Sequence, residues 1–515
     1  MLIDTRELPP DSLIEADLMI VGGGIAGIAM AREFGQSGID VCILESGGEE
    51  PEPEVQELYA GKARMHGAGN DSLDIDDYLT SSRFRYLGGS GNAWGGKCVP
   101  LDSADFTGRD WVPGSGWPLT RRELQPFYDR ACDLFDICHF PLNPSAHWTE
   151  ERPAVHLGDA GLQSLPRCFT RCTGASRDNT YGAFKASVTD SAHTRVYLHA
   201  NVRNIRLRKD GSAVESLEVA TLDGRRHKAR AHCYVLATGG IENARLLLAS
   251  NDIAPGGIGN DNDLVGRFFQ GHVTLGMFDG AAGRNSSMFL TQLDQPFDLY
   301  VDGDRSTVQA VLGPTWEAQK QNRLRNCTLT PFSTWYEAHA SSKAIMNTSF
   351  LLDRKQEQPG PGAVDTAHFA FFFMVEQAPN EQSRITLTDR RDRLGMPRVQ
   401  LDWDFHEQDF EELDRAVAFF RRELGRTARG RLEWPVLREE LIGNMSASRH
   451  HNGSTRMNES PKRGVVDPDC RLHDVSNLYV AGSSVFPTGG IANPTLTLVA
   501  LAMRLSDHLK LELRG

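Results

Sequence analysis

The segment that decides the fold reads ADLMIVGGGIAGIAMAREFGQSGIDVCILESGG and spans residues 16–48. Its apolar run at 18–21 is typical of a buried parallel strand. Three glycines follow in a G-x-G-x-x-G pattern, and apolar residues then recur at helical spacing as far as the glycine at 38. A second apolar run at 41–44 ends in an acidic residue. This order of strand, glycine turn, helix, strand and acid predicts a dinucleotide-binding unit.

Each residue of this pattern has a physical role. Gly22 permits a tight turn, Gly24 lets the backbone approach a pyrophosphate, and Gly27 allows the helix to pack closely on the strand. The free N–H groups and positive dipole end of the helix would face the phosphates. Glu45 would accept hydrogen bonds from ribose hydroxyls and would repel the extra phosphate of NADP. The pattern alone does not separate NAD from FAD, but its position, with other flavin-like segments far downstream, favours FAD.

Composition and charge exclude several classes of protein. The chain has 515 residues, of which 40% are hydrophobic and 24% charged, so it is neither disordered nor fibrous. A net charge of −13 argues against nucleic-acid binding and would tolerate a cationic substrate. No apolar stretch approaches the roughly 20 residues that a membrane span needs. The N-terminus lacks the features of a signal peptide, so we expect a cytoplasmic protein and leave oligomerisation open.

The nine cysteines are few and scattered, apart from Cys168 and Cys172. A Cys-x3-Cys pair without a second pair nearby is a poor zinc signal. We therefore expect reduced thiols and no metal site.

Several segments predict the organisation of the first half. Residues 233–250 have the pattern of a strand, a glycine turn and a helix, and such a returning strand would rejoin the first sheet. Residues 194–237 resemble hairpin strands, and residues 61–78 resemble a loop. Residues 85–100 contain five glycines within nine positions, so they would form either a surface excursion or a loop lying along a cofactor.

The middle of the chain differs in character. Strand patterns recur between about 270 and 400, interrupted by a polar candidate for a mobile loop at 353–366. Residues 405–424 predict an amphipathic helix that ends at Gly425. The helix would place Phe410, Leu413, Val417, Phe420 and Leu424 on one face.

A second chemical signal lies near the C-terminus, at 446–510. A strand pattern at 477–482 and a turn at 486–490 precede a helix that begins at Pro494, where a proline is well tolerated. The positive end of this helix could face the edge of a flavin ring, where negative charge collects on reduction. His450 and His451 are adjacent, so they project differently. Either could be the base of an alcohol oxidation, or either could be structural.

Taken together, these segments resemble the glucose–methanol–choline (GMC) flavoprotein oxidoreductases. The resemblance covers about half the chain. It is carried by GGGIAG, RYLGGSGNAWGG, SGWP, LATGGIENARLL, HHNGSTRM and NLYVAGSSVFPTGGIANPTLT. The middle third matches only loosely, at SRITL (383–387).

The resemblance implies non-metal oxidation of a CH–OH group with FAD. It also implies an α/β fold that combines a discontinuous Rossmann-like FAD-binding domain with a β-sheet-based (α+β) substrate domain. Residues 1–270 and 445–515 would form the FAD-binding domain, and residues 271–444 the substrate domain.

The resemblance also implies roles for individual residues. His450, three residues before Gly453, matches the catalytic base of the family, and His451 would support it. Asn493 matches the second catalytic position and would orient and polarise the alcohol, although an asparagine before a helix is also a good N-cap.

For the cofactor, Ala93 stands where some relatives carry a histidine that binds FAD covalently, so FAD should be non-covalent. The residues expected to contact FAD are Gly22, Gly24, Gly27, Glu45, Gly91, Asn92, Ala93, Trp94, Val202, Ala237, Gly482, Pro494 and Thr495.

The C-terminal motif looks most similar to the pyranose oxidase and glycoside 3-oxidase branch. That implies a secondary alcohol on a sugar, glycoside or cyclitol as substrate, with O₂ or a quinone-like compound as electron acceptor. An aminoglycoside or amino-sugar alcohol dehydrogenase of the same family is an alternative. A flavoprotein with structural FAD and a non-redox role is a further one, against which the presence of both His450 and Asn493 speaks.

Overall fold

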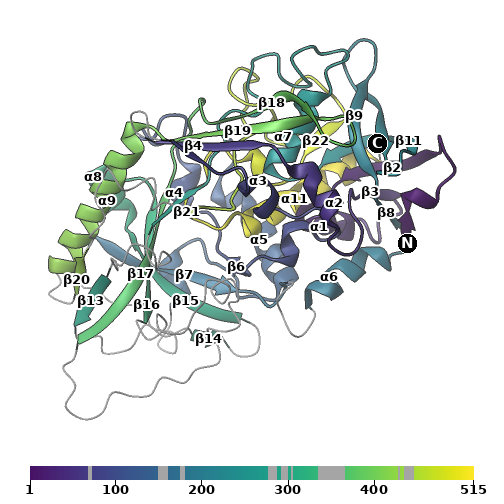
Figure 1. Cartoon of the computed structure of the whole chain (residues 1–515). Coiled ribbons are helices and arrows are strands. Elements are labelled where there is room, and N and C mark those ends of the chain that lie inside the picture. Colours follow the sequence, from purple (N-terminus) through teal and green to yellow (C-terminus); the bar gives the residue numbers. More distant parts are fainter. Residues whose placement is uncertain are drawn as a thin grey trace.

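A computed structural model describes most of the chain, and three sheets organise this part of it. Figure 1 shows an elongated molecule with the eight-stranded sheet and both chain ends on one side and the ten-stranded sheet on the other. The residues described are 1–67, 72–148, 161–173, 180–275, 287–291, 300–302, 306–333, 366–426, 430–433 and 446–514.

The eight-stranded sheet is parallel at its centre and antiparallel at one edge. The long strand β11 pairs in parallel with the whole length of β2, and its last residues also pair with β22. This confirms that the strand predicted within 233–250 rejoins the first sheet. The strands, in spatial order, are β1 (Leu2–Asp4), β8 (Thr194–Leu198), β3 (Val41–Leu44), β2 (Leu13–Val21), β11 (Arg226–Leu236), β10 (Val214–Ala220) and β9 (Asn201–Leu207), with β22 (Leu478–Val480) beside β11.

The hairpins predicted over 194–237 form only in part. β9, β10 and β11 pair as consecutive antiparallel strands. β8 instead lies parallel to β1 and β3, because its buried residues complete the parallel core of the sheet.

The helices beside this sheet come from distant parts of the chain. α1 follows the glycine turn, and α11 packs against both α1 and α5. β22 and α11 thus bring the C-terminal segment into the unit that residues 16–48 begin. The helices of this region are α1 (Ile25–Glu33), α5 (Arg121–Phe135), α6 (Thr180–Thr189), α7 (Gly240–Ala249) and α11 (Pro494–Glu512), with the short α2 (Pro53–Gln56), α3 (Tyr78–Ser81) and α4 (Ser103–Phe106).

The ten-stranded sheet forms the second part of the molecule. β6 and β7, which lie within residues 1–270, pair in this sheet, and the domain boundaries stay a prediction. Residues 353–365 of the predicted mobile loop lie outside the described residues. The strands are β20 (Gly430–Glu433), β13 (Ser287–Thr291), β17 (Thr366–Glu376), β16 (Cys327–Ser333), β15 (Ser306–Pro314), β7 (Leu162–Phe169) and β6 (Lys97–Cys98), with β12 (His272–Leu275), β21 (Ser446–Ala447) and β14 (Tyr300–Asp302) beside them.

One face of this sheet is covered by α9 (Glu407–Arg426), next to α8 (Trp316–Asn322) (Figure 1). α9 buries the predicted apolar face, and the ring of Phe420 meets Phe373 edge-on at 5.5 Å. The sequence predicts that the helix ends at Gly425, but in the structure it continues to Arg426. A glycine inside a helix costs only about 1 kcal/mol, which packing outweighs.

The opposite face, here called the inner face, is defined by strand alternation, because successive side chains point to opposite sides of a sheet. Since Phe373 contacts α9, the next residue, Met374, lies on the inner face. The register then places His272, opposite Glu376, on that same face.

The four-stranded sheet corrects a prediction. Residues 61–78, predicted as a loop, contain β4 (Lys62–His66) and β5 (Ser72–Asp74). β4 pairs in parallel with β19 (Pro397–Asp404), which also pairs with β18 (Arg384–Arg391). The partner strand lies more than 300 residues away in the sequence, so local composition could not reveal it.

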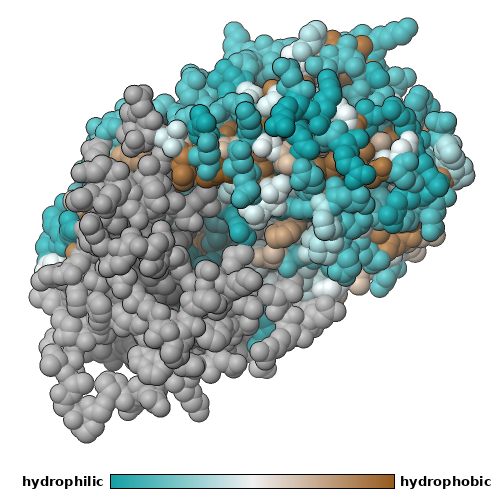
Figure 2. All heavy atoms as spheres, viewed as in Figure 1, coloured by the Kyte–Doolittle hydropathy of each residue, from teal (hydrophilic) through white to brown (hydrophobic). Residues whose placement is uncertain are grey.

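The surface agrees with the composition. Figure 2 shows that the described atoms on the visible face are mostly hydrophilic, with hydrophobic residues in small groups. No helix in the described ranges combines the length and apolar character needed to cross a membrane.

Candidate active site

A cavity of about 450 Å³ lies where the glycine turn after β2 meets the start of α11. The carboxyl ends of parallel strands share one edge of a sheet, so segments far apart in the sequence converge there. Gly27 and Asn92 do not line the cavity. The predicted residues that do line it are Gly22, Gly24, Glu45, Gly91, Ala93, Trp94, Val202, Ala237, His450, His451, Gly482, Asn493, Pro494 and Thr495.

The three glycines of the turn have the geometry that their spacing predicts. Gly22 has a φ of +107°, and a Cβ there would lie 2.6 Å from the carbonyl oxygen of Ala237. A Cβ on Gly27 would overlap the carbonyl oxygen of Gly22, so this glycine serves close packing rather than contact with a ligand. A Cβ on Gly24 would meet no atom within 4 Å and would extend into open space at the cavity wall.

Glu45 directly follows β3 and lies at the cavity wall, nearly fully buried. One carboxylate oxygen accepts a hydrogen bond of 2.8 Å from the N–H of Gly23, and the other accepts one of 2.9 Å from the N–H of Gly47. The oxygen bonded to Gly47 also accepts a hydrogen bond of 3.1 Å from the hydroxyl of Ser46, so the carboxylate is held in place and the oxygen bonded to Gly23 keeps a lone pair for a further partner.

The glycine-rich loop over 85–100 lies along the cavity rather than on the surface alone. Asn92 shapes the loop instead of lining the cavity. Its Nδ2 donates to the carbonyl oxygens of Leu87 and Gly89, both at 3.0 Å. Its Oδ1 accepts from Lys185 at 3.3 Å. Asparagine commonly bonds to nearby backbone in turns, so this role could have been predicted from the glycines around it.

The side chain of His450 is held by a chain of hydrogen bonds. The carbonyl oxygen of Gly490 can only accept, so His272 Nε2 carries a proton and donates a hydrogen bond of 3.0 Å to it. The neutral His272 then has a lone pair on Nδ1, which lies 2.6 Å from Nδ1 of His450. His450 consequently carries its proton on Nδ1 and a lone pair on Nε2. Sequence reasoning missed His272, because nothing around it in the sequence marks a functional residue.

Asn493 completes this arrangement. It stands at the N-cap position of α11, but its side chain makes no capping hydrogen bond. Its Nδ2 lies 3.2 Å from Nε2 of His450, so the amide donates to the lone pair. Its Oδ1 is buried and has no hydrogen-bond partner among the described residues. The geometry thus favours a role at the site over the capping alternative.

The surroundings keep these histidines neutral. Burial, and then the charges of His272, His451, Lys97 and Arg167, hold the pKa of His450 well below its usual value. Burial lowers the pKa of His272 to about 4. Near neutral pH, Nε2 of His450 is therefore an unprotonated base.

His451 projects away from His450, as the adjacency of the two predicts. Its Nε2 lies 2.9 Å from the hydroxyl of Tyr78, which itself donates to the carbonyl oxygen of Ser448. Its ring packs against Tyr78 and Phe269. His451 thus anchors the segment that carries His450.

The cavity also has charged lining that the sequence did not indicate. Glu242, on α7, lines it and is paired with three arginines, whose charges lower its pKa to about 2 despite burial. These are Arg83 at 2.9 Å, Arg85 at 3.3 Å and Arg245 at 3.3 Å. Lys97 lines the cavity as well.

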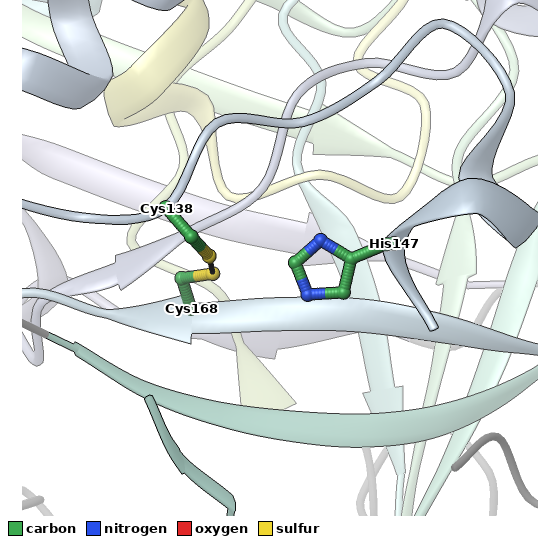
Figure 3. A group of neighbouring side chains, drawn as sticks. All are labelled: Cys138, His147 and Cys168. Atoms are coloured by element: carbon green, nitrogen blue, oxygen red, sulfur yellow. Dashed lines mark hydrogen bonds between the residues drawn. The ribbon is translucent and has the colours of Figure 1, made fainter. Parts of the chain in front are cut away.

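A separate group of possible metal ligands is shown in Figure 3. Cys138, His147 and Cys168 each offer a ligand atom, and these atoms lie within 4.8 Å of one another. The pair singled out in the sequence, Cys168 and Cys172, is thus not the pair that the fold brings together. The sulfurs of Cys138 and Cys168 are 2.7 Å apart, closer than the ~3.8 Å that two thiolates bound tetrahedrally to zinc would keep.

A family profile described as GMC oxidoreductase matches residues 379–502. Among solved structures, pyridoxine 4-oxidase from Mesorbium loti has a similar fold, with a TM-score of 0.57 and 18% sequence identity. The match covers 96% of this chain and 99% of that one. The fold is therefore the GMC oxidoreductase fold, as predicted.

Curated relatives extend the comparison. The chain is 24% identical to a 2-methyl-1,2-propanediol dehydrogenase of Mycolicibacterium austroafricanum, over 96% of this chain and 95% of that protein. It is 26% identical to a 6'''-hydroxyparomomycin C oxidase of Streptomyces lividus, over 95% and 90%. The similarity to a C-glycoside 3-oxidase of Arthrobacter globiformis, at 37% identity, spans 24% of this chain and 23% of that protein.

The turn geometry leads to a prediction about two glycines. Gly27→Ala should lower the thermal unfolding midpoint of the apoprotein, because the new Cβ overlaps the Gly22 carbonyl. The matched variant Gly24→Ala should leave that midpoint within about 1 °C but weaken dinucleotide binding, because its Cβ extends only into the cavity. Calorimetry and equilibrium titration of the apoprotein with FAD measure the two effects. An unfolding midpoint lowered equally in both variants would contradict this division of roles.

Proposed function

This chain belongs to the GMC oxidoreductases and acts on CH–OH donors, and from this premise we propose that it oxidises a secondary alcohol of a sugar, glycoside or cyclitol with FAD. The observation that carries the proposal is the pair formed by His450 and Asn493. The lone pair of His450 Nε2 and the amide of Asn493 lie 3.2 Å apart at the wall of a cavity that begins at a dinucleotide turn.

In the proposed reaction, His450 is the base. FAD held by the cavity residues would supply the acceptor for the hydride that leaves the carbinol carbon. The substrate hydroxyl replaces the amide of Asn493 as the partner of His450 and donates its proton to Nε2. Asn493 Nδ2 then donates to the alcohol oxygen and stabilises the charge that develops there. His272 acts as a positioning residue, because it keeps the proton of His450 on Nδ1.

The residues of the cavity fit FAD. The N–H groups at the start of α1 and the open space at Gly24 suit the pyrophosphate. Glu45 would bind the ribose, and Val202 would lie at the adenine. Gly91, Ala93 and Trp94 would line the flavin ring, together with Ala237, Gly482, Pro494 and Thr495.

The choice of a sugar or glycoside rests on the C-terminal motifs and on the partial similarity to C-glycoside 3-oxidases. The aminoglycoside alternative is favoured by the similarity to 6'''-hydroxyparomomycin C oxidase over nearly the whole chain. A non-redox flavoprotein is disfavoured, because a structural cofactor needs no base paired with an amide. For the electron acceptor, we propose O₂ or a quinone-like compound; peroxide formation compared with reduction of a quinone dye separates them.

The role of His450 is tested by His450→Ala. The variant should still bind FAD, and anaerobic flavin reduction by a reacting alcohol should slow roughly 10²-fold or more, because it lacks the imidazole that takes the hydroxyl proton in the proposed reaction. Stopped-flow absorbance at the flavin band measures the rate. His139→Ala, which removes an exposed histidine, serves as the control. Flavin reduction near the wild-type rate in His450→Ala would show that another group is the base.

The mode of FAD binding is tested by acid precipitation. Ala93 offers no nucleophilic side chain at the cavity wall, so all flavin should appear in the supernatant. Absorbance of the pellet and supernatant measures it. Flavin that stays with the precipitated chain would overturn non-covalent binding.

The pH dependence of flavin reduction follows from the low pKa of His450. A histidine with its ordinary pKa near 6.5 would become protonated, and inactive as a base, as the pH falls through 6.5. Because the folded-state pKa of His450 is depressed, the neutral base should persist, and the reduction rate should stay within about twofold from pH 8 to 5.5. Stopped-flow measurement over that range checks this, and a tenfold loss centred near pH 6.5 would contradict it.

A further inference from the structure

An arginine without a carboxylate partner is buried beside the reaction centre. Arg167, on β7, is 3% exposed. Its one hydrogen bond among the described residues is a long one, 3.5 Å from Nη1 to the hydroxyl of Thr330, and its Nε has no partner there. Removing a guanidinium from water without an opposite charge is costly, so this arrangement calls for a ligand or another compensating group.

Other buried arginines of the described part are compensated. Arg109 forms two hydrogen bonds of 2.7 Å with Glu376, and Arg245 pairs with Asp392 at 2.7 Å. Arg456 has no carboxylate but donates to a backbone carbonyl and lies over an aromatic ring. Arg121 does the same. Arg167 has neither arrangement, which sets it apart.

Lys97 stands close to Arg167 on the same face. In the β6–β7 register, Lys97 lies opposite Phe169. Phe169 is two residues beyond Arg167 on β7, so the side chains of Lys97 and Arg167 lie on the same side of the sheet. Leu329 lies opposite Phe373, which faces α9, so the next residue, Thr330, lies on the other side of the sheet. Because Arg167 contacts Thr330, this side is the inner face.

The two cations lie beside the histidines of the proposed reaction. The charges of both cations lower the pKa of His450, and the charge of Arg167 also lowers the pKa of His272. Burial and the charge of Arg167 lower the pKa of Lys97 to about 8, and no carboxylate offsets either effect. Burial lowers the pKa of Arg167 to about 10. The carboxylate of Glu376 also acts on His272, and it is already paired with Arg109.

A smaller cavity of about 70 Å³ lies at Arg167. It is also lined by Thr328, whose hydroxyl is buried without a partner in the described ranges, and by Ala492, the neighbour of Asn493. Asp105 lines it too, but its oxygens accept hydrogen bonds from Asn326 and from the N–H of Asp102. Burial, and next the charge of Glu376, raise the pKa of Asp105 to about 7, which reduces its negative charge.

We propose that the substrate alcohol carries a carboxylate, as a uronic acid or its glycoside does, and that Arg167 and Lys97 bind this group. The inference rests on the proposed function and names its substrate class. A guanidinium matches the two oxygens of a carboxylate, and an ammonium adds a point charge. The same cations disfavour the aminoglycoside alternative, because protonated amines would add like charges to an already cationic wall.

The test compares two substrates that differ in one group. A methyl glucoside and the corresponding methyl glucuronoside share the ring hydroxyls and differ only by a CH₂OH or a carboxylate. Anaerobic flavin reduction of the holoenzyme gives kcat/KM for each, and titration of the flavin spectrum gives the binding of each. The glucuronoside should have the higher kcat/KM, by about tenfold or more, the scale of one charge-assisted hydrogen bond.

Charge-removing variants locate the effect. Arg167→Met and Lys97→Met should each lower the ratio of kcat/KM for the acid to that for the neutral glycoside by about tenfold, whereas Arg167→Lys should retain part of it. Arg206→Met, which removes an exposed cation of β9, is the matched control and should leave the ratio unchanged. Circular dichroism and the bound flavin spectrum confirm that each variant is folded.

The outcomes separate this inference from the function on which it rests. If neither glycoside, nor any other alcohol of a broad panel, reduces the flavin, the proposed function fails. If the neutral glycoside reacts as well as the acid, or if the two Met variants slow both substrates equally, the carboxylate inference alone is overturned. In the latter case, the cations act on the cofactor or the base rather than on the substrate.

Discussion

The structure depends on the parallel pairing of β11 with both β2 and β22. β2 ends in the glycine turn, and β22 leads toward the segment that carries Asn493. Because parallel strands end at the same edge, this pairing brings the glycine turn and the segment of Asn493 to the wall of one cavity. Without it, the helix start suited to a pyrophosphate and the pair His450–Asn493 would be parts of unrelated surfaces. The α1–α11–α5 packing then holds the C-terminal helix in that position.

The second constraint is electrostatic. The ten-stranded sheet presents its inner face to the same region and contributes His272, which orients His450, and the cations Lys97 and Arg167. Burial and positive charge together disfavour a protonated imidazole, so His450 is neutral near neutral pH. The same field favours negative charge in whatever binds there. The sheet thus sets both the tautomer of His450 and the positive charge beside it. The motif that contains His450 sets neither.

The predictions from sequence succeeded where a residue's role is local. The turn at Gly22, the packing at Gly27 and the strands around them follow from chain conformation over about 30 residues. They failed where the role depends on a distant partner. Local composition predicts a loop at β4, because its partner β19 lies far along the chain. Asn92 is an exception: the resemblance predicts contact with the flavin, but the side chain bonds to its own loop, a local interaction that the neighbouring glycines could have indicated.

By itself, the sequence determined the dinucleotide unit, the two-part α/β architecture and the residues of the H-x-x-G motif, because spacing, glycine conformation and apolar periodicity are properties of neighbouring residues. Only the tertiary structure decided which nitrogen of His450 holds the lone pair, that Asn493 bonds to His450 instead of capping α11, and that Arg167 lies buried without a carboxylate. These are relations between side chains separated by tens to hundreds of residues. Hydrogen-bond geometry and burial depend on which surfaces meet, and the order of residues along the chain does not specify that directly.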